Sequence, residues 1–153
     1  MATVFDVANW FLANTSDVTN KKLQKLTYYA YSWHLTLSND SPDDLSVRLF
    51  PNKFEAWVHG AADPELYAAY KKFGSSCIPH YADAIESFSP DEINILGQVN
   101  STYGRYNGNE LESINHQEDP WIKARKNLPW YEPSHELIKD IDIFNYYSRQ
   151  ASE

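Results

Sequence analysis

Apolar residues recur at a helical spacing between positions 23 and 37. They are separated by steps of three and four residues and comprise Leu23, Leu26, Ala30, Trp33 and Leu37. Such steps place side chains on one face of a helix, in a continuous apolar stripe. We therefore predict a long amphipathic helix that begins at Thr19 or Asn20 and runs to about Leu37. Trp33 is expected to lie in the core, because it belongs to the stripe.

Helix start signals follow at several points along the chain. Asp63-Pro64-Glu65 supplies a cap, a proline at the first helical position and an acid near the positive end of the helix dipole. Ser89-Pro90-Asp91-Glu92 repeats this signal and completes a capping box, as Thr3 and Asp6 do near the N-terminus. Helices are therefore expected over 3–12, 63–73, 89–103, 109–114, 119–126 and 141–149. Loops are expected over 38–48 and 127–136.

Residues 49–58 lean towards β structure. Short apolar and aromatic runs flank the turn signal Pro51-Asn52, which favours a small hairpin. The expected fold class is mainly α, a single compact helical domain of about six to eight helices with this β-hairpin. The domain is expected to span residues 1–153, with a core over about 4–149 and no separate DNA-binding domain.

Acidic residues outnumber basic ones, with 21 Asp and Glu against 13 Lys and Arg and a net charge of −8. A polyanion is repelled by phosphate groups, so we expect no nucleic-acid partner and no membrane partner. The stretch from Glu86 to Asp119 holds seven of the acids and one base, Arg105. This local excess either steers a basic partner or forms a solvated face, and the sequence leaves both open.

The residues that carry chemistry do not form a recognisable catalytic motif. Phosphate-binding loops, nucleophile elbows and zinc-protease motifs are missing, and His116-Gln117-Glu118 lacks the further ligands that a zinc site needs. Cys77 is the single cysteine, and Pro79 interrupts the turn that would bring His80 to it. A buried or half-buried thiol is therefore expected, without a disulfide in the chain. We expect no enzyme, no cofactor and no metal.

The sequence also bears on where the protein resides. No stretch resembles a signal peptide, and no apolar run reaches the roughly 18 residues of a membrane-spanning helix. The expectation is a cytoplasmic protein in a reducing compartment.

Three short motifs follow one another along the chain. They are Lys22-Leu23-Gln24-Lys25-Leu26 with Trp33-His34-Leu35, then Glu55-Ala56-Trp57 with His59-Gly60, and finally His116-Gln117-Glu118-Asp119-Pro120-Trp121. Together they resemble the Panacea domain, a family that includes SocA-like and phage-associated GepA-like antitoxins, over about residues 6–147. One departure is Gly60-Ala61-Ala62, where the family has Gly-Pro-Val.

The resemblance implies an antitoxin of a toxin–antitoxin system, which neutralises a cognate protein toxin by direct protein–protein binding. One alternative is a proteolytic adaptor that delivers the toxin to a bacterial protease, with a protease chaperone as a further partner. Another is a phage-encoded counter-defence binding protein, and a third is an enzyme that acts on a toxin's product through His116 and Glu118. The implied setting is a bacterial or phage-infected cell, and formation of a homo-oligomer stays open.

The resemblance also divides the residues into scaffold and surface. The scaffold comprises Lys22, Leu23, Gln24, Lys25, Leu26, Trp33, His34, Glu55, Ala56, Trp57, His59, Gly60, His116, Glu118, Pro120 and Trp121. Its polar members either form a hydrogen-bond network that locks the loops or meet the toxin. A domain that serves many unrelated toxins should keep its scaffold and vary its surface, so contacts are predicted on rigid tyrosines outside the motifs. These are Tyr28, Tyr31, Tyr67, Tyr70 and Tyr106.

Overall fold

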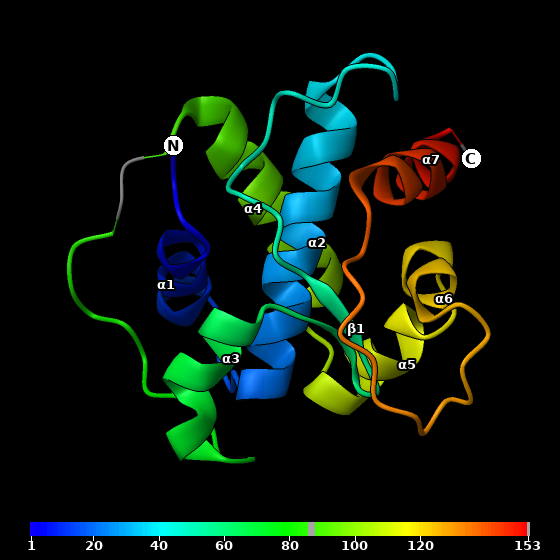
Figure 1. Ribbon diagram of the computed structural model, residues 1–153. Coiled ribbons are helices and arrows are strands. Elements are labelled where there is room, and N and C mark those ends of the chain that lie inside the picture. Colours follow the sequence, from blue (N-terminus) through cyan, green and yellow to red (C-terminus); the bar gives the residue numbers. More distant parts are fainter. Residues whose placement is uncertain (86–87, 153) are drawn as a thin grey trace.

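Helix α2 (Asn20–Ser38) runs through the middle of the molecule, and the other helices are arranged around it (Figure 1). The computed structural model describes residues 1–85 and 88–152. Besides α2, these form α1 (Val4–Asn14), β1 (Glu55–Trp57), β2 (Gly60–Ala62), α3 (Pro64–Tyr70), the 3-10 turn η1 (Lys71–Phe73), α4 (Pro90–Tyr103), α5 (Gly108–Asn115), α6 (Asp119–Arg125) and α7 (Asp140–Ala151). Seven α-helices and one small antiparallel sheet in the described residues confirm the predicted fold class.

Helix α2 is buried on nearly all sides, which corrects the expectation of a single apolar stripe. Fifteen of its 19 residues are buried, because α1, α3, α4, α5, α7 and β2 all contact it. Polar side chains such as Gln24 and Lys25 therefore lie in the interior, whereas Leu37 at the end of the stripe is 54 % exposed. Trp33 is partly buried and packs on Tyr147, with ring centroids 5.2 Å apart.

The helix starts follow the capping signals of the sequence. The side chains of Thr3, Ser89 and Asn107 accept a hydrogen bond from the third residue of their helices, and the acid at that position bonds back to the cap backbone. Asp63 caps α3 by accepting two backbone N–H bonds, at 3.0 and 3.2 Å. These bonds satisfy N–H groups that a helix leaves free at its start. The Asn107 box places the start of α5 at Gly108, one residue earlier than expected.

The hairpin lies further along the chain than residues 49–58. Strands β1 and β2 pair antiparallel with Trp57 opposite Gly60, so the two residues between them form the turn. The expected turn signal Pro51-Asn52 instead leads into β1, where Asn52 Oδ1 accepts a backbone N–H bond two residues on, at 2.9 Å. Gly60 has a φ of 99°, a conformation that side chains other than hydrogen disfavour. The hairpin therefore forms where a glycine is available.

The core contains several tyrosines. Tyr28, Tyr29, Tyr31 and Tyr147 are among the largest fully buried side chains. Tyr29 also stacks on Tyr103, with ring centroids 4.0 Å apart. Their rings supply apolar area while each hydroxyl needs a hydrogen-bond partner. With polar groups spread even through the central helix, no helix of the described residues has the length and apolar character to cross a bilayer.

Candidate functional site

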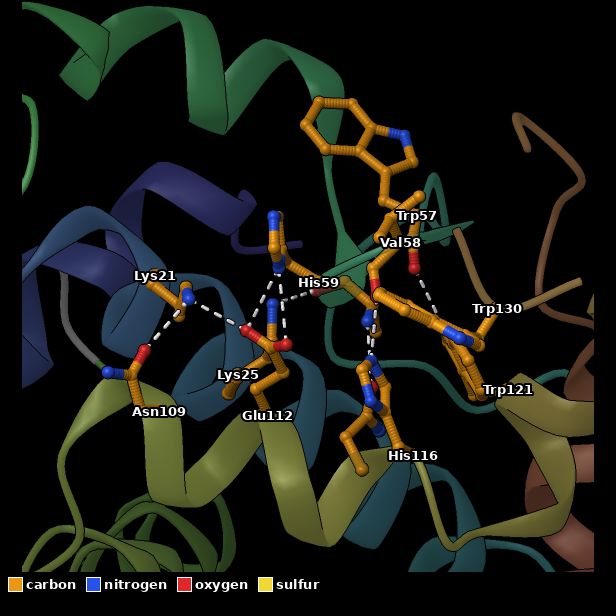
Figure 2. A network of polar contacts seen from close by, with 12 residues as sticks. Lys21, Lys25, Trp57, Val58, His59, Asn109, Glu112, His116, Trp121 and Trp130 are labelled. Carbon is orange, nitrogen blue, oxygen red and sulfur yellow. Dashed lines mark hydrogen bonds and ion pairs between the residues drawn. The ribbon is translucent and has the colours of Figure 1, made fainter. Parts of the chain in front are cut away.

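Three consecutive backbone carbonyls of the hairpin are held by side chains from the end of α5 and from α6. His116 Nε2 lies 2.7 Å from Val58 O, Trp121 Nε1 lies 2.8 Å from Trp57 O, and Arg125 Nη1 lies 3.3 Å from Ala56 O. Figure 2 shows the first two of these bonds. The rings of His116 and Trp121 are stacked, with centroids 4.2 Å apart. A carbonyl only accepts, so Nε2 of His116 carries a proton. Burial lowers the pKa of His116, which favours the neutral ring.

The second strand of the hairpin is held from α2 and α5. Lys25 Nζ donates to Ala61 O at 3.0 Å, and Asn115 Oδ1 accepts from the Ala61 N–H at 2.7 Å. Gln24 Oε1 accepts the N–H of Asp63 at 3.0 Å, just beyond β2. Gln24 and Lys25 belong to the first motif, so all three motifs meet at the hairpin. The departure from Gly-Pro-Val is part of this contact, because a proline at position 61 has no N–H to give Asn115.

Gly60 is a position where the packing leaves no room for a side chain. A Cβ there would lie 2.7 Å from Cε of Lys25 and 2.8 Å from Oδ1 of Asn115. Both of those side chains bond to Ala61. A larger residue at this position would therefore displace the two hydrogen bonds that hold β2.

Glu118 joins the start of α6 to α2 and α7 in the interior. Its Oε1 accepts hydrogen bonds from Tyr29 OH at 2.8 Å and Tyr147 OH at 3.0 Å, and a longer one from Asn115 Nδ2 at 3.4 Å. Burial raises the pKa of Glu118 to about 7, although these donors act in the opposite direction. The carboxyl therefore titrates near neutral pH inside the protein.

The His116–Glu118 arrangement that the sequence suggested does not have the geometry of a catalytic pair. His116 Nε2 is engaged by the Val58 carbonyl, while Glu118 faces the tyrosine hydroxyls. Cys77 is exposed, which corrects the expected burial. Its neighbour Ile78 is the residue that turns inwards, with its N–H bonded to Val18 O at 2.8 Å. In the described part of the chain, no three His, Cys, Asp or Glu side chains gather as metal ligands would.

A groove of about 520 Å³ lies beside the hairpin, between the first turns of α2 and α5 and the turn η1. We call it the basic groove, because its lining includes the cationic or titratable side chains Lys21, Lys25, His59 and Lys71, together with the aromatic Trp57 and Tyr67. At its rim, Lys21 Nζ lies 2.7 Å from Glu112 Oε1 and 2.9 Å from Asn109 Oδ1 (Figure 2). His59 Nδ1 lies 3.2 Å from the same carboxylate.

A second feature is the segment 128–131, which we call the aromatic loop. Trp130 is 71 % exposed and Tyr131 is 61 % exposed. Their rings meet edge to face, with centroids 5.7 Å apart. Beneath them the buried Arg125 donates through Nη2 to the carbonyls of Pro129 at 2.8 Å and Trp130 at 3.1 Å. The backbone that carries the two exposed rings is therefore fastened to an interior guanidinium.

The five tyrosines predicted to contact a partner fall into two groups. Tyr28 and Tyr31 have no exposed area, which removes them from the surface, because α2 is surrounded on that side. Tyr67, Tyr70 and Tyr106 are partly exposed. Contact of these three with a partner stays a prediction.

Sequence reasoning missed Asn115, Arg125, Trp130 and Tyr131. For the two aromatic residues a signal was present, because Pro129 and Pro133 enclose them in a loop where no core is expected. Asn115 and Arg125 gave no such signal, since the hairpin backbone groups that they bond, at Ala61 and Ala56, are far away in the chain.

The fold and its hairpin contacts define a helical domain whose three sequence motifs form a single scaffold. A family model described as "Antitoxin SocA-like, Panacea domain" matches residues 23–122, about two thirds of the chain. The chain therefore belongs to this antitoxin family, which confirms the resemblance. Comparison with curated proteins and with solved structures gave no match.

Proposed function

We propose that the protein neutralises a cognate protein toxin by binding it directly. Membership of the antitoxin family supports a toxin as the kind of partner. The observation that favours direct binding is the aromatic loop, whose two large rings contribute little to the protein's own core. Tryptophan and tyrosine dominate the energetics of protein–protein contacts when they become buried there.

The way the aromatic loop is held strengthens this argument. A mobile loop loses conformational entropy when it binds, and that loss weakens the complex. Arg125 already fixes the carbonyls of Pro129 and Trp130 in the free protein. The loop therefore presents a prearranged aromatic surface, as rigid binding loops do in other recognition proteins.

The acidic run between residues 86 and 119 carries less surface charge than its sequence indicates. Glu118 is buried, and Glu112 and Asp119 are in ion pairs at 2.7 and 2.9 Å. Glu86 lies outside the described residues. Long-range attraction of a basic toxin would therefore depend on the net charge of −8 of the whole chain rather than on this segment.

The test needs the product of a neighbouring reading frame that arrests growth when expressed alone. Trp130→Ala and Tyr131→Ala should each weaken binding of that toxin by roughly 30-fold, the effect of about 2 kcal/mol at a contact centre, and should abolish rescue of growth. Leu37→Ala is the matched control, because Leu37 is also exposed and apolar but lies at the far end of α2. Circular dichroism checks that each variant is folded.

Several results would contradict the proposal or redirect it. Unchanged toxin binding by both loop variants would exclude the aromatic loop, and loss of binding by alanine variants of Tyr67, Tyr70 or Tyr106 would place the contact at those residues instead. A shorter toxin lifetime in the presence of the protein would indicate a proteolytic adaptor. Rescue of growth without any binding would favour an enzyme, and a phage-encoded counter-defence role would require a host protein as the ligand.

A further inference from the structure

We propose that the basic groove binds a small molecule that carries a phosphate group beside a flat ring, a nucleotide being the simplest example. The site is separate from the aromatic loop and does not depend on the antitoxin proposal. Three observations support it: the charged side chains that line the groove, the burial and hydrogen bonding of Lys25, and the rings of Trp57 and Tyr67 in its wall.

The charge of the groove is opposite to that of the protein. The chain has a net charge of −8, yet the described residues that line the groove include Lys21, Lys25 and Lys71 and no Asp or Glu. Three carboxylates in the described part of the chain contact residues of the lining. Glu112 is bonded by Lys21 and His59 at 2.7 and 3.2 Å, Glu55 accepts from the indole of Trp57, and Glu110 accepts from the backbone of Asn107. Among the described residues, Lys25 and Lys71 are in no ion pair, so these two side chains are the ones that would attract an anion.

Lys25 is a buried ammonium with spare hydrogen-bonding capacity. Its side chain lines the groove although the residue is only 2 % exposed. An ammonium has three donors, and among the described residues only Ala61 O, at 3.0 Å, accepts from it. Burial lowers the pKa of Lys25 to about 7, the nearby Glu112 acting in the opposite direction. A phosphate oxygen in the groove would supply both the missing acceptor and the missing negative charge.

The wall of the groove fits a flat ring. Trp57 and Tyr67 both line it, with ring centroids 5.1 Å apart. The indole N–H of Trp57 donates to Glu55 Oε1 at 2.8 Å, which fixes the orientation of its ring. A volume of about 520 Å³ is within the range of sites that enclose small molecules. The amides of Asn20 and Asn109, from the first turns of α2 and α5, also line the groove.

Calorimetric titration of ADP into the full chain tests the proposal. Lys71→Gln should weaken ADP binding about fivefold, as expected for loss of one exposed charge contact. Lys72→Gln is the matched control, because Lys72 neighbours Lys71 in the same exposed turn but does not line the groove. Lys25→Met should weaken binding at least about tenfold, and the result for Lys71 keeps the test valid if this core variant unfolds.

Two further ligands test the phosphate contacts and the ring contacts of the site separately. Inorganic pyrophosphate should bind more weakly than ADP, and adenosine should not bind measurably. Adenosine binding as tight as that of ADP, or equal weakening by Lys71→Gln and Lys72→Gln, would overturn the assignment. So would the absence of ADP binding at on the order of 1 mM. If ADP fails to bind but the Lys25 and Lys71 variants lose toxin binding, the groove takes an acidic segment of the toxin instead.

Discussion

Replacement of Glu118 by glutamine should remove a pH-dependent weakness from the core. The carboxyl is buried and its Oε1 accepts three hydrogen bonds, from Tyr29, Tyr147 and Asn115. Glutamine has nearly the same shape and keeps an acceptor oxygen for the two tyrosines, but it does not ionise. The variant therefore isolates the effect of the charge.

The size of the effect follows from the pKa. Burial raises the pKa of Glu118 from 4.5 to about 7, so between these values the folded protein keeps a proton that the unfolded chain has lost. Stability must then fall as the pH rises through this window, and it stays low above it. The difference corresponds to about 3 kcal/mol of unfolding free energy. Lys25 acts in another window, because its pKa falls from 10.5 to about 7 and its deprotonation restores stability only as the pH rises above 7.

Urea unfolding at pH 5, 6, 7 and 8, followed by tryptophan fluorescence, measures this effect. The quantity to compare is the difference in unfolding free energy between wild type and Glu118→Gln at each pH. Other titrating groups, such as His34 and His116, are present in both proteins, so their contributions largely cancel. Relative to wild type, the variant should gain about 2.5 kcal/mol between pH 5 and pH 8, because part of the window lies below pH 5.

A matched control is Glu132→Gln, because Glu132 is an exposed glutamate near the aromatic loop. Its difference from wild type should stay within about 0.5 kcal/mol at every pH. If the Glu118→Gln difference is equally flat, the buried carboxyl does not carry the pH dependence and the reasoning is wrong.

Three further predictions concern other parts of the structure. Gly60→Ala should lower the unfolding free energy measured in urea by about 3 kcal/mol, because Gly60 has a positive φ and an added Cβ would clash with Lys25. Gly97→Ala is the control and should not lower it, because a Cβ at Gly97 meets nothing within 4 Å. Equal effects of the two substitutions would contradict the packing argument. Arg125→Met should speed amide hydrogen exchange of Leu128 and Glu132, whose N–H groups are bonded to Arg125 O and Pro129 O, by at least about tenfold, and unchanged exchange would show that the loop is held otherwise. Cys77 should react with a thiol reagent in the native protein, and protection until unfolding would contradict its exposure.

Local signals in the sequence predicted the helices well. Caps such as Ser89 and Asp63 act on N–H groups within three residues, so their effect does not depend on the rest of the fold. The position of the hairpin was harder to predict from the sequence, because Pro51-Asn52 and Gly60 are competing turn signals. The positive φ at Gly60 and the contacts around it decide between them.

The candidate site was predicted only in part. The motifs pointed to residues such as Gln24 and His116, but not to their partners, which are backbone groups of the hairpin. Tyrosine placement failed for a similar reason. Tyr28 and Tyr31 look like surface residues beside an apolar stripe, and only the packing of helices on every side of α2 puts them in the core.

The hairpin contacts have a consequence for how any partner can attach. The N–H and carbonyl of Ala56 are taken by Glu136 O and Arg125, and those of Ala61 by Asn115 and Lys25. Exposed strand edges usually invite another chain to add a strand, either in recognition or in aggregation. Here the central residues of both strands have no backbone group left for such pairing. A partner that binds at the hairpin must therefore contact side chains, so surface substitutions can change which partner binds there while the two-stranded sheet itself stays the same.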